Sequence, residues 1–136
     1  MAAAACAIGD ASYDRDNQAL MDTIPQYPGA TLAARTKFTE RFPETSRTLV
    51  YVYATENSSE QVLAFFREQL GAQSWEQQTG TKDQLLGVYS KGEAQLEVNT
   101  QSTILEPNYV DAEHVERLTD VPEDTAMIFT IAVNAR

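Results

Sequence analysis

The sequence has very few of the residues that most often build disulfides and metal centres. It contains one cysteine, Cys6, and one histidine, His114. A single cysteine forms no internal disulfide and no cysteine zinc cluster, and a single histidine excludes a two-histidine metal site. The acidic residues near the start, from Asp10 to Asn17, lack the central glycine and the closing glutamate of an EF-hand loop. We therefore expect no metal and no cofactor.

Long apolar runs and positive charges are also scarce. No apolar run approaches the roughly 20 residues that a membrane-spanning helix needs. Ten Lys and Arg against twenty Asp and Glu give a net charge of -10. This charge repels a phosphate backbone and an anionic lipid surface. We expect no nucleic-acid partner, and contact with a membrane only through an attached lipid.

The motifs of common catalytic sites are missing as well. The chain has no glycine-rich loop that would cradle a phosphate and no nucleophile elbow. His114 has Glu113 beside it and Glu116 close by, but neighbouring residues on a helix do not converge on one point. The sequence therefore predicts a protein that is not an enzyme.

The strongest signal that is present is a helix in residues 57–75. Ser58 and Gln61 have the spacing of a capping box, and Gly71 is a natural stop. Apolar residues at helical spacing form one stripe: Val62, Leu63, Phe66 and Leu70. An apolar stripe of this kind needs a partner surface, so the helix is expected to cover a sheet.

Alternating apolar and polar residues predict the strands of that sheet. They fall at Thr31–Thr39, Arg47–Thr55, Asp83–Ser90, Glu93–Thr103 and Ala126–Asn134. The resulting order is strand, strand, helix, strand, strand, strand. We predict an α+β fold with a single antiparallel sheet of about five strands and one main helix packed on one face. The domain spans residues 24–136.

Residues 1–23 show no strand or helix pattern and are interpreted as a flexible arm or a lipoprotein tether. The small residues Ala2 to Ala5 before Cys6 are typical of the end of a bacterial lipoprotein signal, in which the cysteine is acylated. We therefore predict Cys6 as the lipid attachment site. The alternative is an alanine-rich start with an incidental thiol. The choice between these two interpretations also decides the compartment. With the lipid, the protein belongs to the bacterial cell envelope, either anchored on the outer side of the cytoplasmic membrane or periplasmic. Without it, the protein is soluble and cytoplasmic.

Residues 24–103 carry a family resemblance. The segment IPQYPGA, a strand ending in YAT, and SSEQVLAFFREQL followed by Trp75 resemble a class of small uncharacterised bacterial envelope or lipoprotein domains. In that class the tryptophan follows a glycine, whereas Ser74 stands here. The resemblance implies a fold and an envelope location and transfers no activity.

Residues 104–125 form an acidic insertion between the last two strands, longer than an ordinary connection. We predict a short helix from Asp111 through Leu118. We also predict that the segment contacts a protein partner. The candidate contact residues are Tyr109, Glu113, His114, Glu116 and Arg117.

Two functions follow from these observations. The first is a non-catalytic, envelope-associated accessory subunit that contacts a larger protein, such as a membrane complex, through the acidic insertion. The alternative is a carrier of a small apolar ligand between sheet and helix. A cavity beneath the helix would favour the carrier, and a filled core with an exposed apolar patch would favour the accessory subunit.

Overall fold

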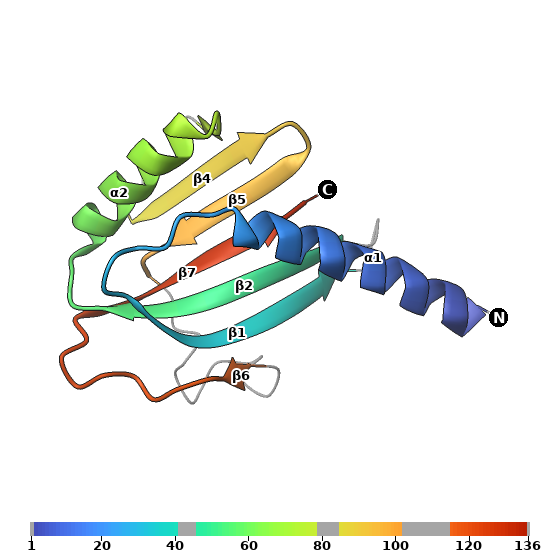
Figure 1. Cartoon of the computed structure of the whole chain (residues 1–136), viewed down its shortest axis with the longest axis horizontal. Coiled ribbons are helices and arrows are strands. Elements are labelled where there is room, and N and C mark those ends of the chain that lie inside the picture. Colours follow the sequence, from blue (N-terminus) through green and yellow to red (C-terminus); the bar gives the residue numbers. More distant parts are fainter. Residues whose placement is uncertain (1, 41–45, 79–84, 102–114, 136) are drawn as a thin grey trace.

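The computed structural model describes residues 2–40, 46–78, 85–101 and 115–135. Within these ranges the chain forms helices and strands that are shown in Figure 1. In chain order they are α1 (Ala2–Asp22), β1 (Thr31–Glu40), β2 (Ser46–Thr55), α2 (Ser59–Ala72), β3 (Glu76–Gln77), β4 (Leu86–Lys91), β5 (Ala94–Asn99), β6 (Glu116–Arg117) and β7 (Met127–Asn134).

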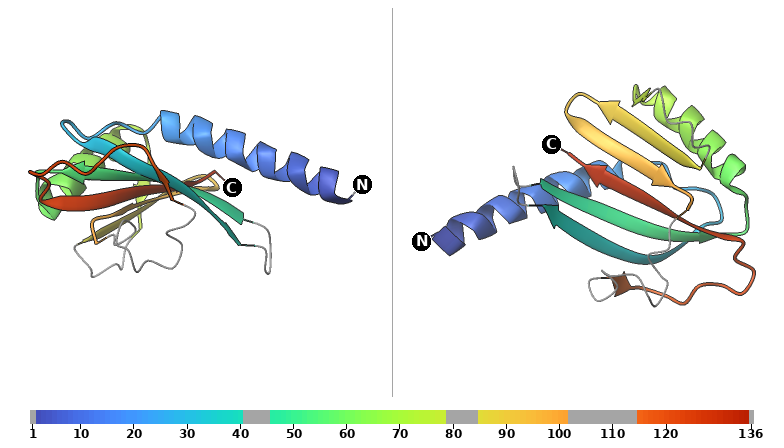
Figure 2. Two further views of the ribbon diagram at one scale, coloured as in Figure 1. Left: turned by 90° about the horizontal axis from the view of Figure 1, so that it is seen from below. Right: turned by 180° about the vertical axis from the view of Figure 1, so that it is seen from behind.

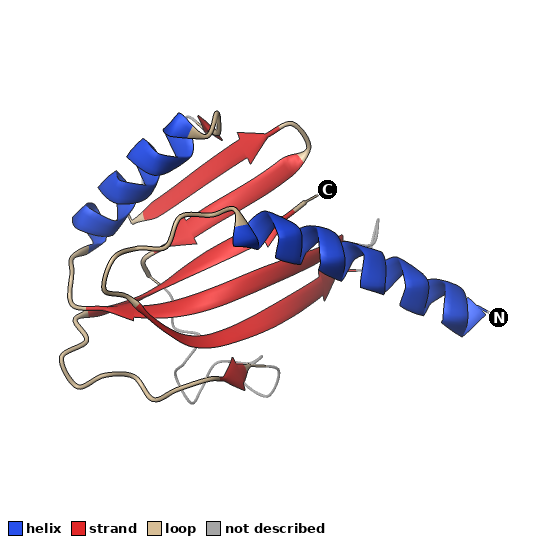
Figure 3. Ribbon diagram, viewed as in Figure 1, coloured by secondary structure: helices blue, strands red, loops and turns tan. Residues whose placement is uncertain are grey.

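The strands form one sheet in the order β3-β4-β5-β7-β2-β1-β6, and all neighbours are antiparallel. β2 lies inside the sheet between β7 and β1, and residues from both of its faces, Leu49 and Val50, are buried. Figure 3 shows α1 lying across this sheet and α2 lying alongside β4. Seen edge-on in Figure 2, α1 lies on one side of the sheet, and its N-terminal part extends beyond the strands.

The α+β class and the single antiparallel sheet agree with the sequence analysis, but the predicted number of elements is wrong. The sheet has seven strands where about five were expected, and the described residues contain a second helix, α1. β3 and β6 each have only two residues, too few for an alternating pattern. α1 shows no apolar stripe, and among its residues 11–22 the most buried is polar: Asn17 is 1% exposed.

The core lies between one face of the sheet and the two helices. Residues from α1, α2 and the strands share one buried cluster. Aromatic rings dominate its centre: the centroids of Phe66 on α2 and Phe129 on β7 are 6.1 Å apart, and Tyr53 stacks on Phe129 at 5.2 Å. Tyr27, in the connection from α1 to β1, adds an edge-to-face contact with Phe129. Such aromatic pairs stabilise the core beyond the area that they bury.

α2 begins as predicted. Ser58 is its N-cap, and the reciprocal hydrogen bonds with Gln61 form a complete capping box. Its predicted stripe faces the core, since Val62, Leu63, Phe66 and Leu70 are all buried.

The predicted stop at Gly71 is one residue early, because α2 continues to Ala72. The chain turns at Ser74, which has a φ of 69°, the left-handed conformation usually taken by glycine. The Ser74 N–H donates to the Gly71 carbonyl and the Trp75 N–H to the Leu70 carbonyl, the pattern of a Schellman motif. Trp75 thereby folds under the helix end and is 5% exposed.

We predict that Ser74→Gly stabilises the protein. Glycine adopts this φ without the steric cost of a Cβ, so the free energy of unfolding should rise by about 1 kcal/mol. Urea unfolding of the parent and the variant measures the change. Ser74→Ala is the matched control, because it removes the hydroxyl but keeps the Cβ, and it should give no gain. A glycine variant no more stable than the alanine variant would contradict a strained turn.

Candidate functional site

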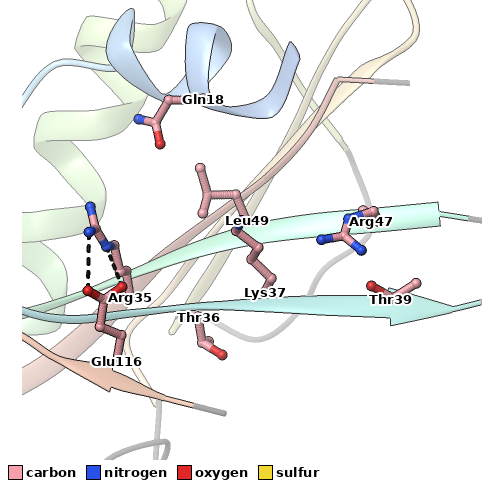
Figure 4. A pocket seen from close by; sticks show the side chains of 8 residues that line it. All are labelled: Gln18, Arg35, Thr36, Lys37, Thr39, Arg47, Leu49 and Glu116. Atoms are coloured by element: carbon pink, nitrogen blue, oxygen red, sulfur yellow. Dashed lines mark hydrogen bonds and ion pairs between the residues drawn. The ribbon is translucent and has the colours of Figure 1, made fainter. Parts of the chain in front are cut away.

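A groove runs between α1 and the outer part of the sheet, and its volume is about 550 Å³. Volumes of roughly 300 to 1,000 Å³ are typical of small-molecule sites. α1 borders the groove on one side, β1 and β2 form its floor, and Glu116 of β6 lies at its margin (Figure 4). The described residues that line it are Gln18, Arg35, Thr36, Lys37, Thr39, Arg47, Leu49 and Glu116.

The strand register explains why cations gather on this floor. Arg35 on β1 lies opposite Tyr51 on β2, Lys37 opposite Leu49, and Thr39 opposite Arg47. Side chains two residues apart on a strand share a face, so these pairs form three neighbouring rows. Arg35, Lys37 and Arg47 are three of only ten Lys and Arg in the chain. The groove therefore concentrates positive charge in a protein that is acidic overall.

Asp14 of α1 connects the helix to two of these cations. The Arg47 guanidinium donates to its carboxylate from Nε at 2.9 Å and from Nη2 at 3.2 Å. The Lys37 ammonium donates to the same carboxylate at 3.2 Å. The Arg47 side chain is only 15% exposed, and the Lys37 side chain is 52% exposed. Limited exposure to water strengthens the interaction at Arg47 relative to that at Lys37.

The third cation pairs across the β1–β6 edge. Arg35 donates to both carboxylate oxygens of Glu116, from Nε at 2.8 Å and from Nη2 at 3.2 Å. The hydrogen bond from Arg35 lowers the pKa of Glu116, and the same bond raises the pKa of Arg35. Both groups stay charged at neutral pH, so the pair holds the Arg35 side chain in a defined position.

A smaller pocket lies next to the groove, beneath the end of α1, and we call it the apolar pocket because most of the residues that line it are aromatic or aliphatic. Its volume is about 120 Å³. Tyr53 closes part of it, and burial raises the pKa of the Tyr53 hydroxyl to about 12, so this group stays neutral. The residues that line the pocket are Met21, Asp22, Ile24, Pro25, Gln26, Tyr27, Tyr51, Tyr53, Phe66 and Ile131.

Gln18 and Tyr51 lie between the groove and the apolar pocket. Gln18 lines the groove, Tyr51 lines the pocket, and the Gln18 Nε2 donates to the Tyr51 hydroxyl at 2.9 Å. The same Gln18 amide nitrogen donates to Asp22 at 2.9 Å. One hydrogen bond between side chains of α1 and β2 therefore connects the lining of the groove to that of the pocket.

Asn17 holds α1 over this region. Its amide nitrogen donates to the Arg47 carbonyl at 2.8 Å, and its amide oxygen accepts from the Ala135 N–H at 2.8 Å. The helix is thereby joined to the start of β2 and to the end of β7 through a side chain that is 1% exposed. Both bonds are partly buried, and an unpaired polar group in such a place is costly.

The structure describes only some of the residues that the sequence predicted as the lipid attachment site and the partner contact. Cys6 lies in the first turns of α1. Tyr109, Glu113 and His114 lie outside the described residues. Glu116 and Arg117 are exposed and form β6, which pairs with Ala34 and Arg35 of β1. The helix predicted through Leu118 is therefore wrong at Glu116 and Arg117, because pairing with a sheet edge overrides the local helical pattern.

The cationic groove was missed in the sequence analysis. Arg35 and Lys37 are two residues apart in the predicted strand at Thr31–Thr39, a spacing that places both on one face, but Gln18 and Asp14 lie in a segment with no predicted structure. Within the described ranges, no three His, Cys, Asp or Glu side chains come together as a metal site would need. None of the helices there has both the length and the hydropathy of a membrane span.

A model of the START domain-like family matches residues 36–114, which is more than half of the 136 residues of the chain. The protein therefore belongs to the START domain-like family. Domains of this kind are generally ligand-binding rather than catalytic. No curated protein and no solved structure gives a significant match. Membership agrees with a ligand-binding fold, in which cavities between helices and sheet are the natural place for a ligand.

We predict that Asn17→Ala weakens the docking of α1. The Arg47 carbonyl and the Ala135 N–H would each lose a buried partner, which should lower the free energy of unfolding by about 1 to 3 kcal/mol. Urea unfolding measures this change. Ala19→Ser is the control, because Ala19 is an exposed position of the same helix, and it should stay within about 0.5 kcal/mol of the parent. Equal stability of Asn17→Ala and the parent would show that the amide does not hold the helix.

Proposed function

We propose that this START domain-like protein is a non-catalytic carrier of a small apolar ligand, held between the sheet and its helices. The observation that supports the proposal is the apolar pocket beneath α1 and α2, in a domain whose family generally binds ligands. The walls come from three layers of structure: Met21 from α1, Phe66 from α2, and Ile131 from β7. A ligand seated there is removed from water on several sides at once, which is the source of its binding free energy.

The pocket also has a polar rim that would orient a ligand. Asp22 and Gln26 line it beside the aromatic and aliphatic residues. The Tyr27 hydroxyl accepts a hydrogen bond from the Asn57 amide and keeps its own O–H as a donor. Tyr27 is therefore held in place as an apolar wall, and a ligand loses little by contacting its ring.

The proposal predicts binding of a neutral aromatic probe, 3-phenyl-1-propanol. In an NMR titration the probe should bind saturably with a Kd of roughly 1 mM, the range expected for about ten heavy atoms. Nuclear Overhauser contacts from its ring should reach the side chains of Met21, Ile24 and Ile131. Contacts located elsewhere, or no saturation, would contradict the carrier.

A pocket-filling variant gives the matched comparison. Ile24→Phe places a larger side chain in the pocket wall and should abolish binding. Leu63→Phe is the control, because Leu63 is equally buried, 7% against 8% exposed, and does not line this pocket. Amide spectra report whether each variant is folded. The Overhauser contacts of the parent keep the test decisive if a variant does not fold.

The second candidate is an envelope-associated accessory subunit. It is supported by the exposed large hydrophobic residues of the described chain, Leu118 at 42% and Val121 at 40%. Both lie in the acidic insertion at 104–125. Large exposed apolar side chains are compatible with a contact surface. In this proposal Glu116, Arg117 and their neighbours contact a protein partner, and a lipid on Cys6 keeps the protein at the membrane.

Analysis of the protein from its native source tests this second candidate. After membranes are extracted with a mild detergent, the protein should copurify with a larger protein, and mass spectrometry should find a diacyl or triacyl mass on an N-terminal Cys6. An intact Met1 with a free thiol would exclude the lipid anchor. Recovery of the protein alone from the soluble fraction would exclude the membrane-bound accessory role and leave the carrier.

A further inference from the structure

The apolar pocket has a single charged side chain in its lining, that of Asp22, the last residue of α1. No lysine or arginine is among the described residues that line it. Asp22 forms no ion pair with any cation of the described chain. The edge of the pocket therefore carries one negative charge that no described cation pairs with.

Gln18 holds the Asp22 carboxylate at this edge. The Gln18 Nε2 donates to the Asp22 Oδ1 at 2.9 Å and to the Tyr51 hydroxyl at 2.9 Å, and both acceptors belong to residues that line the pocket. A side-chain amide has two N–H donors, so one amide serves both. The other carboxylate oxygen of Asp22, Oδ2, accepts no hydrogen bond from the described residues. Asp22 is thus positioned through one oxygen and can bind a ligand with the other.

The cations of the neighbouring groove have carboxylates of their own. Arg35 lies opposite Tyr51 in the strand register, but it directs both Nε and Nη2 at Glu116. Glu116 is the main cause of the raised pKa of Arg35, and Tyr51 is a smaller one. Lys37 and Arg47 both donate to Asp14. These pairs leave the charge of Asp22 to a cation from outside the chain.

We propose that the ligand of the apolar pocket is a small amphipathic amine. Its protonated nitrogen donates a hydrogen bond to Asp22 at the edge, and its aromatic or branched alkyl body fills the pocket. This inference rests on the carrier function proposed above and names the class of ligand. It also assigns Asp22 as the residue that determines the preference for a cation.

The size and the walls of the pocket fit the body of such a ligand. The volume of about 120 Å³ is close to the roughly 150 Å³ of a cavity that holds benzene, so there is room for one ring or a branched alkyl group. Met21, Phe66 and Ile131 supply apolar walls from α1, α2 and β7. Because Asp22 lines the same pocket, a short alkyl chain between ring and nitrogen reaches its carboxylate.

Electrostatics favour a protonated amine over a neutral or anionic group. A primary ammonium has a pKa close to that of lysine, about 10.4, and is charged at neutral pH. A hydrogen bond between two charged groups is roughly twice as strong as one between neutral groups. The net charge of -10 also attracts a cation to the protein and repels an anion. The N–H donors then distinguish a primary amine from other cations.

The first test compares 3-phenylpropylamine with 3-phenyl-1-propanol, which carries a hydroxyl in place of the ammonium group. In NMR titrations at low ionic strength the amine should bind about fivefold more tightly, the upper range for an exposed charge pair. This advantage should fall as sodium chloride is added, because salt screens the attraction. Overhauser contacts should connect its ring to Met21, Ile24 and Ile131, and the methylene beside its nitrogen to Asp22.

A third probe separates the hydrogen bond from the charge. The N,N,N-trimethyl derivative of the amine keeps the positive charge but has no N–H donor, so it should bind less tightly than the primary amine. Equal binding of the two cations would overturn the hydrogen bond to Asp22. This comparison uses the parent protein and depends on no variant.

Charge variants assign the preference to one residue. Asp22→Asn keeps the shape of the side chain and an acceptor for Gln18 but removes the charge, so the amine and the alcohol should bind equally. Glu68→Gln is the matched control, because Glu68 is exposed on α2 and lies outside the pocket lining. It changes the net charge by the same amount and should keep the fivefold preference. An equal loss in both variants would indicate general attraction to an acidic protein and would overturn the role of Asp22.

The outcomes separate this inference from the carrier function. Equal binding of amine and alcohol to the parent, with ring contacts in the pocket, would overturn the preference for an amine and leave the carrier. Binding of the amine without contacts to Met21, Ile24 or Ile131 would overturn the amine site, and the alcohol would then decide the carrier by itself. Failure of both probes to bind would refute the carrier and with it the site.

Discussion

The arrangement of the site depends on one buried amide, that of Asn17. Its two hydrogen bonds connect α1 to the first residues of β2 and to the end of β7, two strands that are neighbours in the sheet. Because these bonds use a donor and an acceptor of fixed geometry, they set the position of the helix as well as its stability. An apolar side chain at the same place would bury comparable area but would form neither of these directional bonds. The groove exists because the helix is held at one place along the strands.

Around this fixed point, a single aromatic layer serves both the core and the proposed ligand site. Phe66 and Phe129 pack against each other in the core, and Phe66 is also a wall of the apolar pocket. Tyr53 stacks on Phe129 while it lines the same pocket. The pocket is therefore formed by side chains that packing already holds rigid. Preorganised walls cost a ligand little conformational entropy on binding.

Local sequence patterns identified the elements with strong periodicity and failed where tertiary contacts decide the structure. The capping box of Ser58, the apolar stripe of α2 and the alternation in β2 and β7 depend on neighbouring residues, and these predictions hold. The two-residue strands and α1 depend on partners far away in the chain. Asn17 is the clearest case. The sequence alone predicts that a polar residue of a helix faces solvent, and only its hydrogen-bond partners at residues 47 and 135 explain why it is buried. The groove was missed for the same reason: its cations come from adjacent strands, and the acids that bind them come from the unpredicted elements α1 and β6.

The position of Asp14 has a mechanical consequence. Its carboxylate belongs to α1, whereas the cations that it binds, Lys37 and Arg47, belong to the sheet. Any anion that draws on these cations competes with the helix for them, and helix docking in turn competes with the anion. The two equilibria are linked, so an occupant of the groove and the contact of α1 with the sheet must change each other's free energy by the same amount. The strength of the contact between α1 and the sheet should therefore change when the groove is occupied.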